Sequence, residues 1–241
     1  MQAAVRWIVR VHKWVALIVG LQVLAWVGGG LGMTLMPIEQ VRAEHTIAPA
    51  PSYPLELSEL ISLEDAREAA GVTALDSARL ERWHDGPVWY LQGGNGLAVI
   101  DARTGEARTP VDEASARAIA QAGFVGDAPI AAITYFPEPT FEYRRPNPAW
   151  QVRFDDGEGT RLYVNAETGR IDARRNDMWR LFDVFWMLHI MDYTERENFN
   201  HPLLISMAFL ALLTVLAGLS LLTVRMRRTL LVALKQRRAK P

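Results

Sequence analysis

The sequence of 241 residues contains no cysteine. This absence excludes a disulfide framework, a Cys-x-x-Cys redox pair, an iron–sulfur cluster and a thiolate zinc site. Covalent attachment of a c-type haem is excluded too, because it requires Cys-x-x-Cys-His. The chain also lacks His-Glu-x-x-His and a Gly-x-Gly-x-x-Gly motif after a strand. The corresponding zinc-protease and dinucleotide-binding sites are therefore not expected.

Acidic residues are missing from both ends of the chain. All 27 Asp and Glu residues fall between Glu39 and Glu197. The formal charge is +3 before this region, −11 within it and +7 after it, so the net charge of −1 hides a partition. The acidic middle argues against a nucleic-acid-binding surface.

Two uncharged apolar runs lie next to the basic ends. Residues 14–36 and 203–224 contain no charged residue. The first run would reach about 34 Å as a helix, which is enough to cross the hydrocarbon of a bilayer. Basic residues flank each run on the side of the nearer chain terminus. Both termini are therefore expected in the cytoplasm. The acidic middle is then expected in the periplasm of a bacterium, with the protein in the inner membrane.

The first run has an alternative interpretation as a cleaved signal peptide. Val41-Arg42-Ala43 loosely resembles a small-residue cleavage site. Signal cores are 7–15 residues long, however, and this run is much longer, which favours a retained anchor. The run also holds Gln22. Several glycines near its expected periplasmic end allow close approach of another helix or of a flat ligand.

The middle of the chain has the pattern of an internal duplication. An extended, proline-containing linker is expected over residues 37–54. Each of two following units contains a helix and then strands; the expected helices are 62–71 and 112–123, and the expected strands are 78–83, 88–92, 97–100, 130–136, 150–154 and 161–164. Trp89 and Trp150 are 61 residues apart, and Gly105 and Gly169 are 64 apart. A matching order at nearly constant spacing predicts a repeat.

Two short motifs in these units have local explanations. The Thr-Gly pairs at Gly105 and Gly169 resemble part of a flavin-transfer site, but glycine is also what a tight hairpin turn requires. Residues 155–159 resemble a calcium loop, but they lack its alternating ligands. Both motifs are interpreted as turns.

A helix followed by an antiparallel hairpin with a Trp strand and an Asp/Asn-Ala-x-Thr-Gly turn resembles the PepSY domain. Two such units between two spans resemble the PepSY-associated transmembrane helix family. His12-Lys13-Trp14 is similar to that family's His-Arg/Lys-Trp start, and Leu188-His189 is similar to its outer Leu-His motif. The resemblance implies an α+β membrane protein in which two transmembrane helices flank a periplasmic domain of two PepSY-like repeats.

The expected organisation follows from these patterns. It comprises a cytoplasmic N-terminus (1–13), a transmembrane helix (14–36), a linker (37–54), PepSY-like repeats (55–110 and 111–176), an interfacial amphipathic helix (177–192), a second transmembrane helix (203–224) and a basic cytoplasmic tail (225–241). The tail is expected to lie on an anionic inner leaflet.

Three of the five histidines are candidate ligands of a haem b iron. His12 lies near the inner end of the first span, where the alternative is an ordinary interfacial histidine. His189 lies on the apolar face of helix 177–192, half a turn away from Arg180, so its ring requires a backbone carbonyl or an iron as a partner. His201 precedes the second span, where Asn200 is the expected helix cap and a solvated histidine is the alternative. His45 and His84 are expected to be surface residues.

One chain places these histidines at opposite faces of the membrane. His12 lies at the inner face, while His189 and His201 lie at the outer face, about 30 Å away. His12 therefore cannot share an iron with His189 or His201. In a homodimer, His12 would pair with its own copy, and the outer pair would be His189 with His201 or either with its copy; a partner membrane subunit could supply the missing ligands instead.

The resemblance implies membrane electron transfer, in which a haem b subunit passes electrons to an extracytoplasmic acceptor such as a ferric siderophore or a flavoprotein. The alternative is a non-enzymatic, membrane-anchored PepSY protein that binds an envelope partner. A third possibility is an assembly subunit of a larger respiratory complex. No catalytic residue is identified for any of the three.

Overall fold

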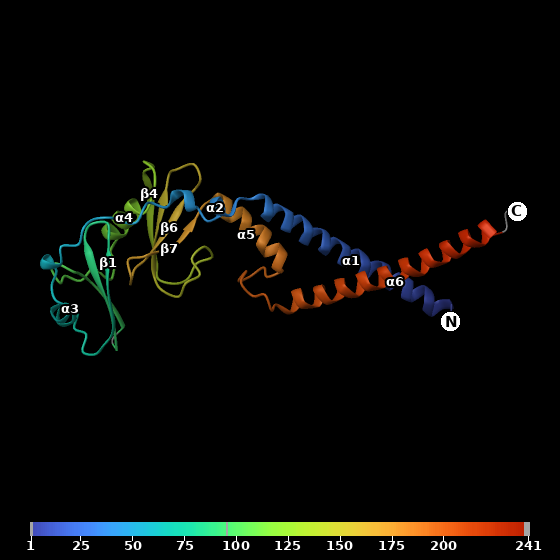
Figure 1. Ribbon diagram of the computed structural model, residues 1–241, viewed down its shortest axis with the longest axis horizontal. Coiled ribbons are helices and arrows are strands. Elements are labelled where there is room, and N and C mark those ends of the chain that lie inside the picture. The colour runs from blue at the N-terminus through green and yellow to red at the C-terminus, as the bar shows by residue number, and fades with distance from the viewer. Residues whose placement is uncertain (1, 95, 239–241) are drawn as a thin grey trace. The chain divides into compact units, whose positions relative to one another are not determined.

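The computed structural model describes the backbone of residues 2–94 and 96–238. The chain forms two compact units (Figure 1). The first, called here the helical unit, contains residues 2–35 and 182–238. The second, called the central domain, runs from Met36 to Leu181.

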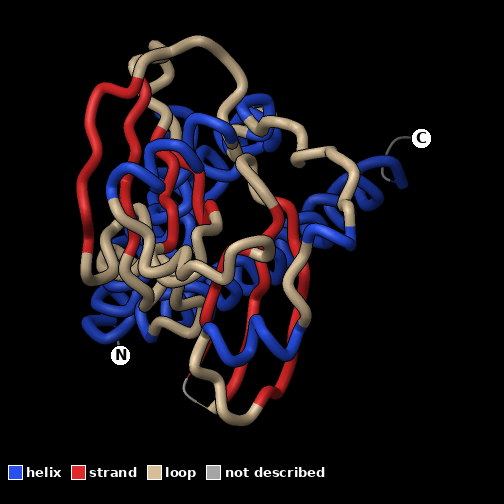
Figure 2. The backbone as a smooth tube through the Cα atoms, turned by 90° about the vertical axis from the view of Figure 1, so that its left-hand side faces the viewer, coloured by secondary structure: helices blue, strands red, loops and turns tan. Residues whose placement is uncertain are grey.

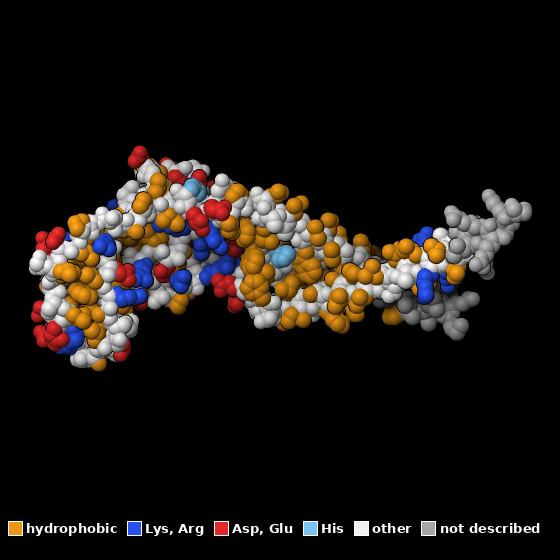
Figure 3. All heavy atoms as spheres, viewed as in Figure 1, with side chains coloured by type: hydrophobic (Ala, Val, Ile, Leu, Met, Phe, Trp, Pro, Cys, Tyr) orange, Lys and Arg blue, Asp and Glu red, His pale blue; other side chains and the backbone are white. Residues whose placement is uncertain are grey.

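Two long helices dominate the helical unit. They are α1 (Gln2–Leu35) and α6 (Pro202–Arg238). Lys13–Leu35 and Pro202–Val232 are long and apolar enough to cross a membrane, and only 11% and 6% of the residues in their most apolar windows are buried. A core helix of a soluble protein would be mostly buried, whereas these helices present an apolar surface (Figure 3).

Two of the glycines near the C-terminal end of α1 pack against another helix. An added Cβ at Gly32 would lie 3.1 Å from the ring of Phe185, and one at Gly29 would lie 3.6 Å from the carbonyl oxygen of Phe185. Phe185 belongs to α5 (Asp177–Ile190). Of the two alternatives for this glycine-rich stretch, the structure therefore shows close helix packing at Gly29 and Gly32.

The linker is not uniformly extended, which corrects the expectation for residues 37–54. It contains α2 (Ile38–Val41) and the 3₁₀ turn η1 (Glu44–Thr46), and a second 3₁₀ turn, η2 (Leu57–Glu59), follows it. Pro37 stands at the N-cap of α2, where its carbonyl accepts the first backbone bonds and its missing N–H costs nothing. The proline content therefore marks the start of a short helix as well as an extended stretch.

The first half of the central domain is a helix packed on a three-stranded sheet. Helix α3 (Leu63–Ala69) begins after Ser62, whose hydroxyl accepts the N–H of Asp65 at 3.1 Å. The antiparallel sheet has the order β1–β2–β3, with β1 at Leu75–Arg82, β2 at Pro87–Gly93 and β3 at Gly96–Asp101. Ala66 of the helix, Leu91 and Ile100 form a buried cluster.

The second half repeats this plan with one more strand. Helix α4 (Glu113–Ala122) is capped by Asp112, which accepts the N–H of Ser115 at 2.7 Å. Its antiparallel sheet has the order β4–β5–β6–β7, with bounds Ile130–Phe136, Ala149–Phe154, Arg161–Asn165 and Ile171–Arg175. Figure 2 shows the two sheets as separate groups of strands.

A common core joins the two halves. Strand β2 is buried on both faces: Leu91 faces α3, while Val88 and Tyr90 belong to the larger cluster. That cluster also contains Ile119 of α4 and Val152 of β5. Because the same cluster draws on both sheets, the central domain folds as one body.

The two Thr-Gly turns have the same pattern of hydrogen bonds. The Asp101 side chain accepts the N–H groups of residues 103 and 104 at 2.8 and 3.0 Å, and the Asn165 side chain accepts those of residues 167 and 168 at 2.9 and 3.1 Å. Gly105 and Gly169 have φ values of 76° and 68°. Glycine is needed here because a side chain is strained at positive φ.

Candidate functional site

The structure places the three candidate haem ligands in the helical unit. His12 lies in α1, and its side chain is outside the described part of the chain. His189 is half-buried in α5, and its Nδ1 is buried without a hydrogen-bond partner among the described residues. A ligating imidazole ordinarily has its second nitrogen held by a carbonyl or carboxylate.

His201 caps a helix, a role that was expected for Asn200. The Nδ1 of His201 accepts the N–H of Leu203 at 3.3 Å, and its carbonyl accepts the N–H of Ile205 at 3.1 Å. Asn200 instead donates its N–H to Asn198. A neutral imidazole that accepts at Nδ1 carries its proton on Nε2, so Nε2 is a donor and is not available to an iron.

The loop after α5 explains a further difference from the sequence prediction. Helix α5 ends at Ile190, and Asp183, expected on the charged side of the helix, is only 4% exposed. Asp183 forms an ion pair with Arg196, and the carbonyl of Arg196 accepts the indole N–H of Trp186 at 3.0 Å. Residues 191–201 therefore fold back on this face of the helix.

Asp192 organises that loop. Its carboxylate accepts the backbone N–H groups of Thr194, Glu195, Glu197 and Asn198 at 3.1–3.2 Å. Burial alone would raise the pKa of Asp192, but these hydrogen bonds outweigh burial and hold the pKa well below its usual range. The loop is thus built around a carboxylate that stays ionised.

The ring environments of the two described candidate ligands differ. His201 uses Nδ1 for capping, whereas Nδ1 of His189 has no hydrogen-bond partner among the described residues. Among the described residues, no group of three or more His, Asp or Glu side chains is arranged to hold a metal ion. Ligation of an iron by His201 would require a different orientation of its ring.

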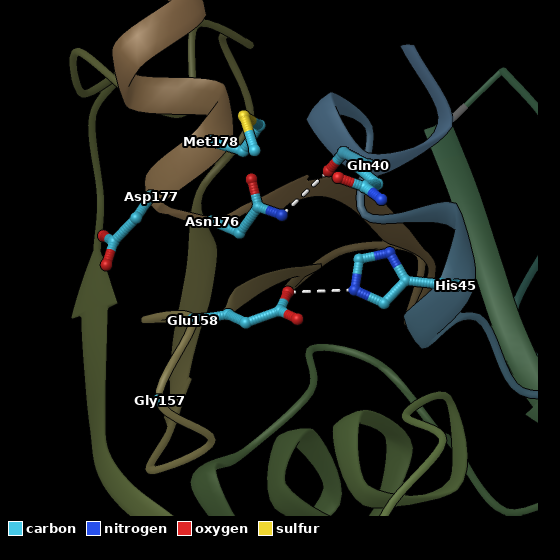
Figure 4. Close-up of a pocket in the computed structure, with 7 residues that line it drawn as sticks. All are labelled: Gln40, His45, Gly157, Glu158, Asn176, Asp177 and Met178. Atoms are coloured by element: carbon cyan, nitrogen blue, oxygen red, sulfur yellow. Dashed lines mark hydrogen bonds and ion pairs between the residues drawn. The ribbon is translucent and has the colours of Figure 1, made fainter. Parts of the chain in front are cut away.

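A cleft in the central domain is the stronger candidate site. It has a volume of about 570 Å³ and is called here the linker cleft (Figure 4). Its lining comes from the linker, the β5–β6 turn and the start of α5: Gln40, His45, Gly157, Glu158, Asn176, Asp177 and Met178.

One wall of the linker cleft is a hydrogen bond between distant segments. His45 Nε2 lies 2.9 Å from a carboxylate oxygen of Glu158, and both side chains are about half exposed. Glu158 is presented by a tight turn in which Asp156 accepts the N–H groups of Glu158 and Thr160 at 3.1 Å. Burial opposes ionisation of Asp156, but its bonds to Thr160 prevail and lower its pKa. The Asp156 carboxylate serves the turn, in agreement with the turn interpretation of residues 155–159.

The floor of the cleft is a set of hydrogen bonds, called here the clamp, between the segments that enter and leave the central domain. Asn176 is 2% exposed and donates its side-chain N–H to the carbonyl of Gln40 at 2.8 Å. Its side-chain oxygen accepts the N–H of Trp179 at 2.8 Å and so caps α5. Asp177 donates its backbone N–H to the carbonyl of Glu158 at 2.9 Å. The clamp fixes the shape of the cleft.

The sequence reasoning did not identify these cleft residues. Asn176 had a detectable signal, because an Asn directly before an apolar helix is a typical N-cap. His45 had none, since its partner Glu158 is 113 residues away along the chain.

The linker cleft carries an acidic rim. The Asp177 side chain is 72% exposed and pairs with Arg180 at 2.6 Å, while that of Glu158 is 51% exposed and bonds His45 at 2.9 Å. Exposed carboxylates attract cationic groups through charge and charge-assisted hydrogen bonds.

Comparison with known proteins identifies one part of the chain. Residues 110–171 match the family model described as "Peptidase propeptide and YPEB domain", which is the PepSY domain. The segment that begins three residues before α4 and ends at the first residue of β7 is therefore a PepSY domain, as its Trp strand and Thr-Gly turn predicted. No curated protein and no solved structure matches the chain.

Proposed function

We propose that this protein is a non-enzymatic, membrane-anchored PepSY binding subunit of the bacterial inner membrane. The central domain lies outside the cytoplasm, and both termini lie inside. The observation that carries the proposal is the combination of a PepSY domain at 110–171 with two exposed apolar helices at the two ends of the chain. The basic residues at the ends of the two helices nearest the chain termini support this orientation.

The first half of the central domain is a second, diverged PepSY-like repeat. Its support is the equivalence of the turns at Asp101 and Asn165, down to the two backbone N–H groups that each side chain accepts. The main chain around the turns corresponds as well, because Ala102 N–H bonds Pro87 and Ala166 N–H bonds Pro148, both at 2.9 Å.

The linker cleft binds a polypeptide segment that carries basic residues. Its exposed carboxylates, Glu158 and Asp177, lie in a region of the chain with a formal charge of −11. The long-range field of that charge steers a cationic partner, and the cleft supplies the local carboxylate contacts.

The test is fluorescence anisotropy of the full-length protein in mild detergent with a labelled Lys/Arg-rich peptide and a Glu-rich peptide. We expect saturable binding of the basic peptide alone, weakened about tenfold by Glu158→Gln, as for the loss of one charge-assisted bond. Glu68→Gln removes an exposed carboxylate from α3 and should leave binding unchanged. Equal weakening by both variants, or binding of the Glu-rich peptide, would contradict the role of the cleft.

A second candidate function is electron transfer through haem b to an extracytoplasmic acceptor. One observation favours it: the His189 ring is half-buried in the helical unit with Nδ1 unbonded, so it has capacity for a partner. In this proposal a homodimer or a partner membrane subunit supplies the remaining ligands, and His12 and His201 are the other candidates of this chain.

A reduced-minus-oxidised absorbance spectrum separates the two functions. The binding subunit is expected to be colourless when it is produced with an adequate haem supply. A b-type band that is lost in His189→Ala and retained in His84→Ala would establish the electron-transfer function instead.

A further inference from the structure

Arginine and aromatic side chains of the central domain gather around Trp179. The ring centroids of Phe141 and Trp179 are 6.4 Å apart in an edge-to-face arrangement. The guanidinium carbons of Arg175 and Arg144 lie 4.2 and 6.0 Å from the centroid of the Trp179 ring, and that of Arg144 lies 5.4 Å from the Phe141 ring. Phe141, Arg144, Arg175 and Trp179 are called here the Arg–Trp cluster.

The loop that carries Phe141 and Arg144 is held rigidly. Tyr143 is fully buried and stacks on Tyr163 with a centroid distance of 5.3 Å. The Tyr143 hydroxyl donates to Asp172 at 3.1 Å, and burial followed by the nearby Asp172 charge raises the pKa of Tyr143. Arg175 donates its Nε–H to the carbonyl of Glu142 at 2.9 Å. The cluster is therefore a fixed surface and needs little ordering to bind.

The loop of residues 137–148 contains two acids, of which Glu138 is exposed and Glu142 is directed into the protein. The Glu142 side chain is 12% exposed and bonds Arg161 and Arg180 at 2.9 and 2.8 Å. The outer side of the loop presents Phe141, which is 46% exposed, and the exposed Arg145. A basic and aromatic surface thus interrupts an otherwise acidic domain.

We propose that the Arg–Trp cluster, with Arg145, binds the phosphate groups of anionic phospholipids at the outer membrane face. Trp179 lies three residues before Phe182, where the chain passes into the helical unit. Tryptophan and arginine are typical of this depth, since the indole suits the interface and the guanidinium fork matches phosphate oxygens. The proposal rests on the membrane anchoring proposed above.

The test uses the full-length protein in nanodiscs of phosphatidylcholine alone or mixed with phosphatidylglycerol. Hydrogen exchange of residues 137–148 is expected to be slower in the anionic nanodiscs, by roughly fivefold for each arginine that engages a headgroup. Arg145→Gln should reduce this difference, and Arg145→Lys should retain most of it. Arg117→Gln, an equal charge change on α4 where Arg117 is 52% exposed, should have no effect.

Three results would overturn the proposal. They are equal exchange in both nanodiscs, an equal effect of Arg117→Gln, and full protection in phosphatidylcholine nanodiscs by added inorganic phosphate, which would indicate a free-anion site. Failure of the protein to enter nanodiscs would instead refute the anchoring. The two proposals therefore fail in distinguishable ways.

Discussion

Gly169→Ala is expected to destabilise the central domain by about 3 kcal/mol, through overpacking and strain at a positive φ. An added Cβ would lie 2.3 Å from two ring atoms of Trp83. Trp83 has little freedom to move away, because its indole N–H donates to the Tyr90 hydroxyl at 3.0 Å and that hydroxyl donates to the carbonyl of Thr168 at 2.8 Å. The measurement is denaturant unfolding of the full-length protein in mild detergent, followed by tryptophan fluorescence.

Two matched glycines separate strain from collision. Gly157 has a φ of 74° and nothing within 4 Å of an added Cβ, so Gly157→Ala should cost only the backbone strain, about 1 kcal/mol. Gly105 has a φ of 76° and ordinary contacts at 3.4 and 3.5 Å, so its alanine variant should resemble that of Gly157. Equal losses in all three variants would show that the Gly169 turn does not pack on Trp83.

Glu142→Ala is expected to cost about 2–3 kcal/mol, because it removes the carboxylate that the partly buried Arg161 and Arg180 share. The Glu142 carboxylate bonds Arg161 Nη1 at 2.9 Å, Arg180 Nε at 2.8 Å and the Tyr163 hydroxyl at 2.9 Å. Removal of the exposed Glu64, which pairs with Arg67 on α3, should cause a much smaller loss. The same unfolding experiment measures both, and equal losses would contradict a buried network.

The Glu142 network also makes the stability of the central domain depend on pH. Burial raises the pKa of Glu142, but the bonds to Arg180 and Tyr163 and the charges of Arg180 and Arg161 outweigh burial, so its folded-state pKa is lowered. The stabilisation is therefore complete above the unfolded pKa of about 4.3 and is lost as the pH falls through the lower folded value. Glu142→Gln should flatten this acid limb of the stability curve.

The sequence predicted those elements whose signals are local. Ser62 and Asp112 each stand directly before a helix and accept the N–H three residues later, as the capping pattern predicts. Strand β4 has the predicted bounds, and β5 and β6 each differ by one residue. In these segments, apolar content and turn residues act over a few positions.

Elements that depend on distant partners were not predicted. Strand β7 contains Ile171 and then mostly charged residues, and every one of its positions is only partly buried. Pairing with β6 holds it, together with Arg174, which donates to the carbonyl of Gly123 at 2.9 Å. No periodicity within five residues can reveal such a strand.

In the candidate site too, local features were predictable from the sequence and contacts between distant residues were not. The clamp from Asn176 to Gln40 joins residues 136 positions apart, so the sequence could show the cap but not the cleft that it closes. The histidine motifs were visible in the sequence. Their ring environments, however, depend on where the backbone of Leu203 lies and on whether another group reaches His189.

The orientation of the central domain is the most direct test of the account. Because the chain has no cysteine, one introduced thiol reports one position. Arg117→Cys places it on exposed α4 of the central domain, and Arg228→Cys places it on α6 beyond the predicted span. In right-side-out membrane vesicles, a membrane-impermeant maleimide is expected to label Arg117→Cys at once and Arg228→Cys only after the membrane is opened. The reverse order of labelling, or release of the protein by an alkaline wash, would contradict an anchored, outward-facing PepSY subunit.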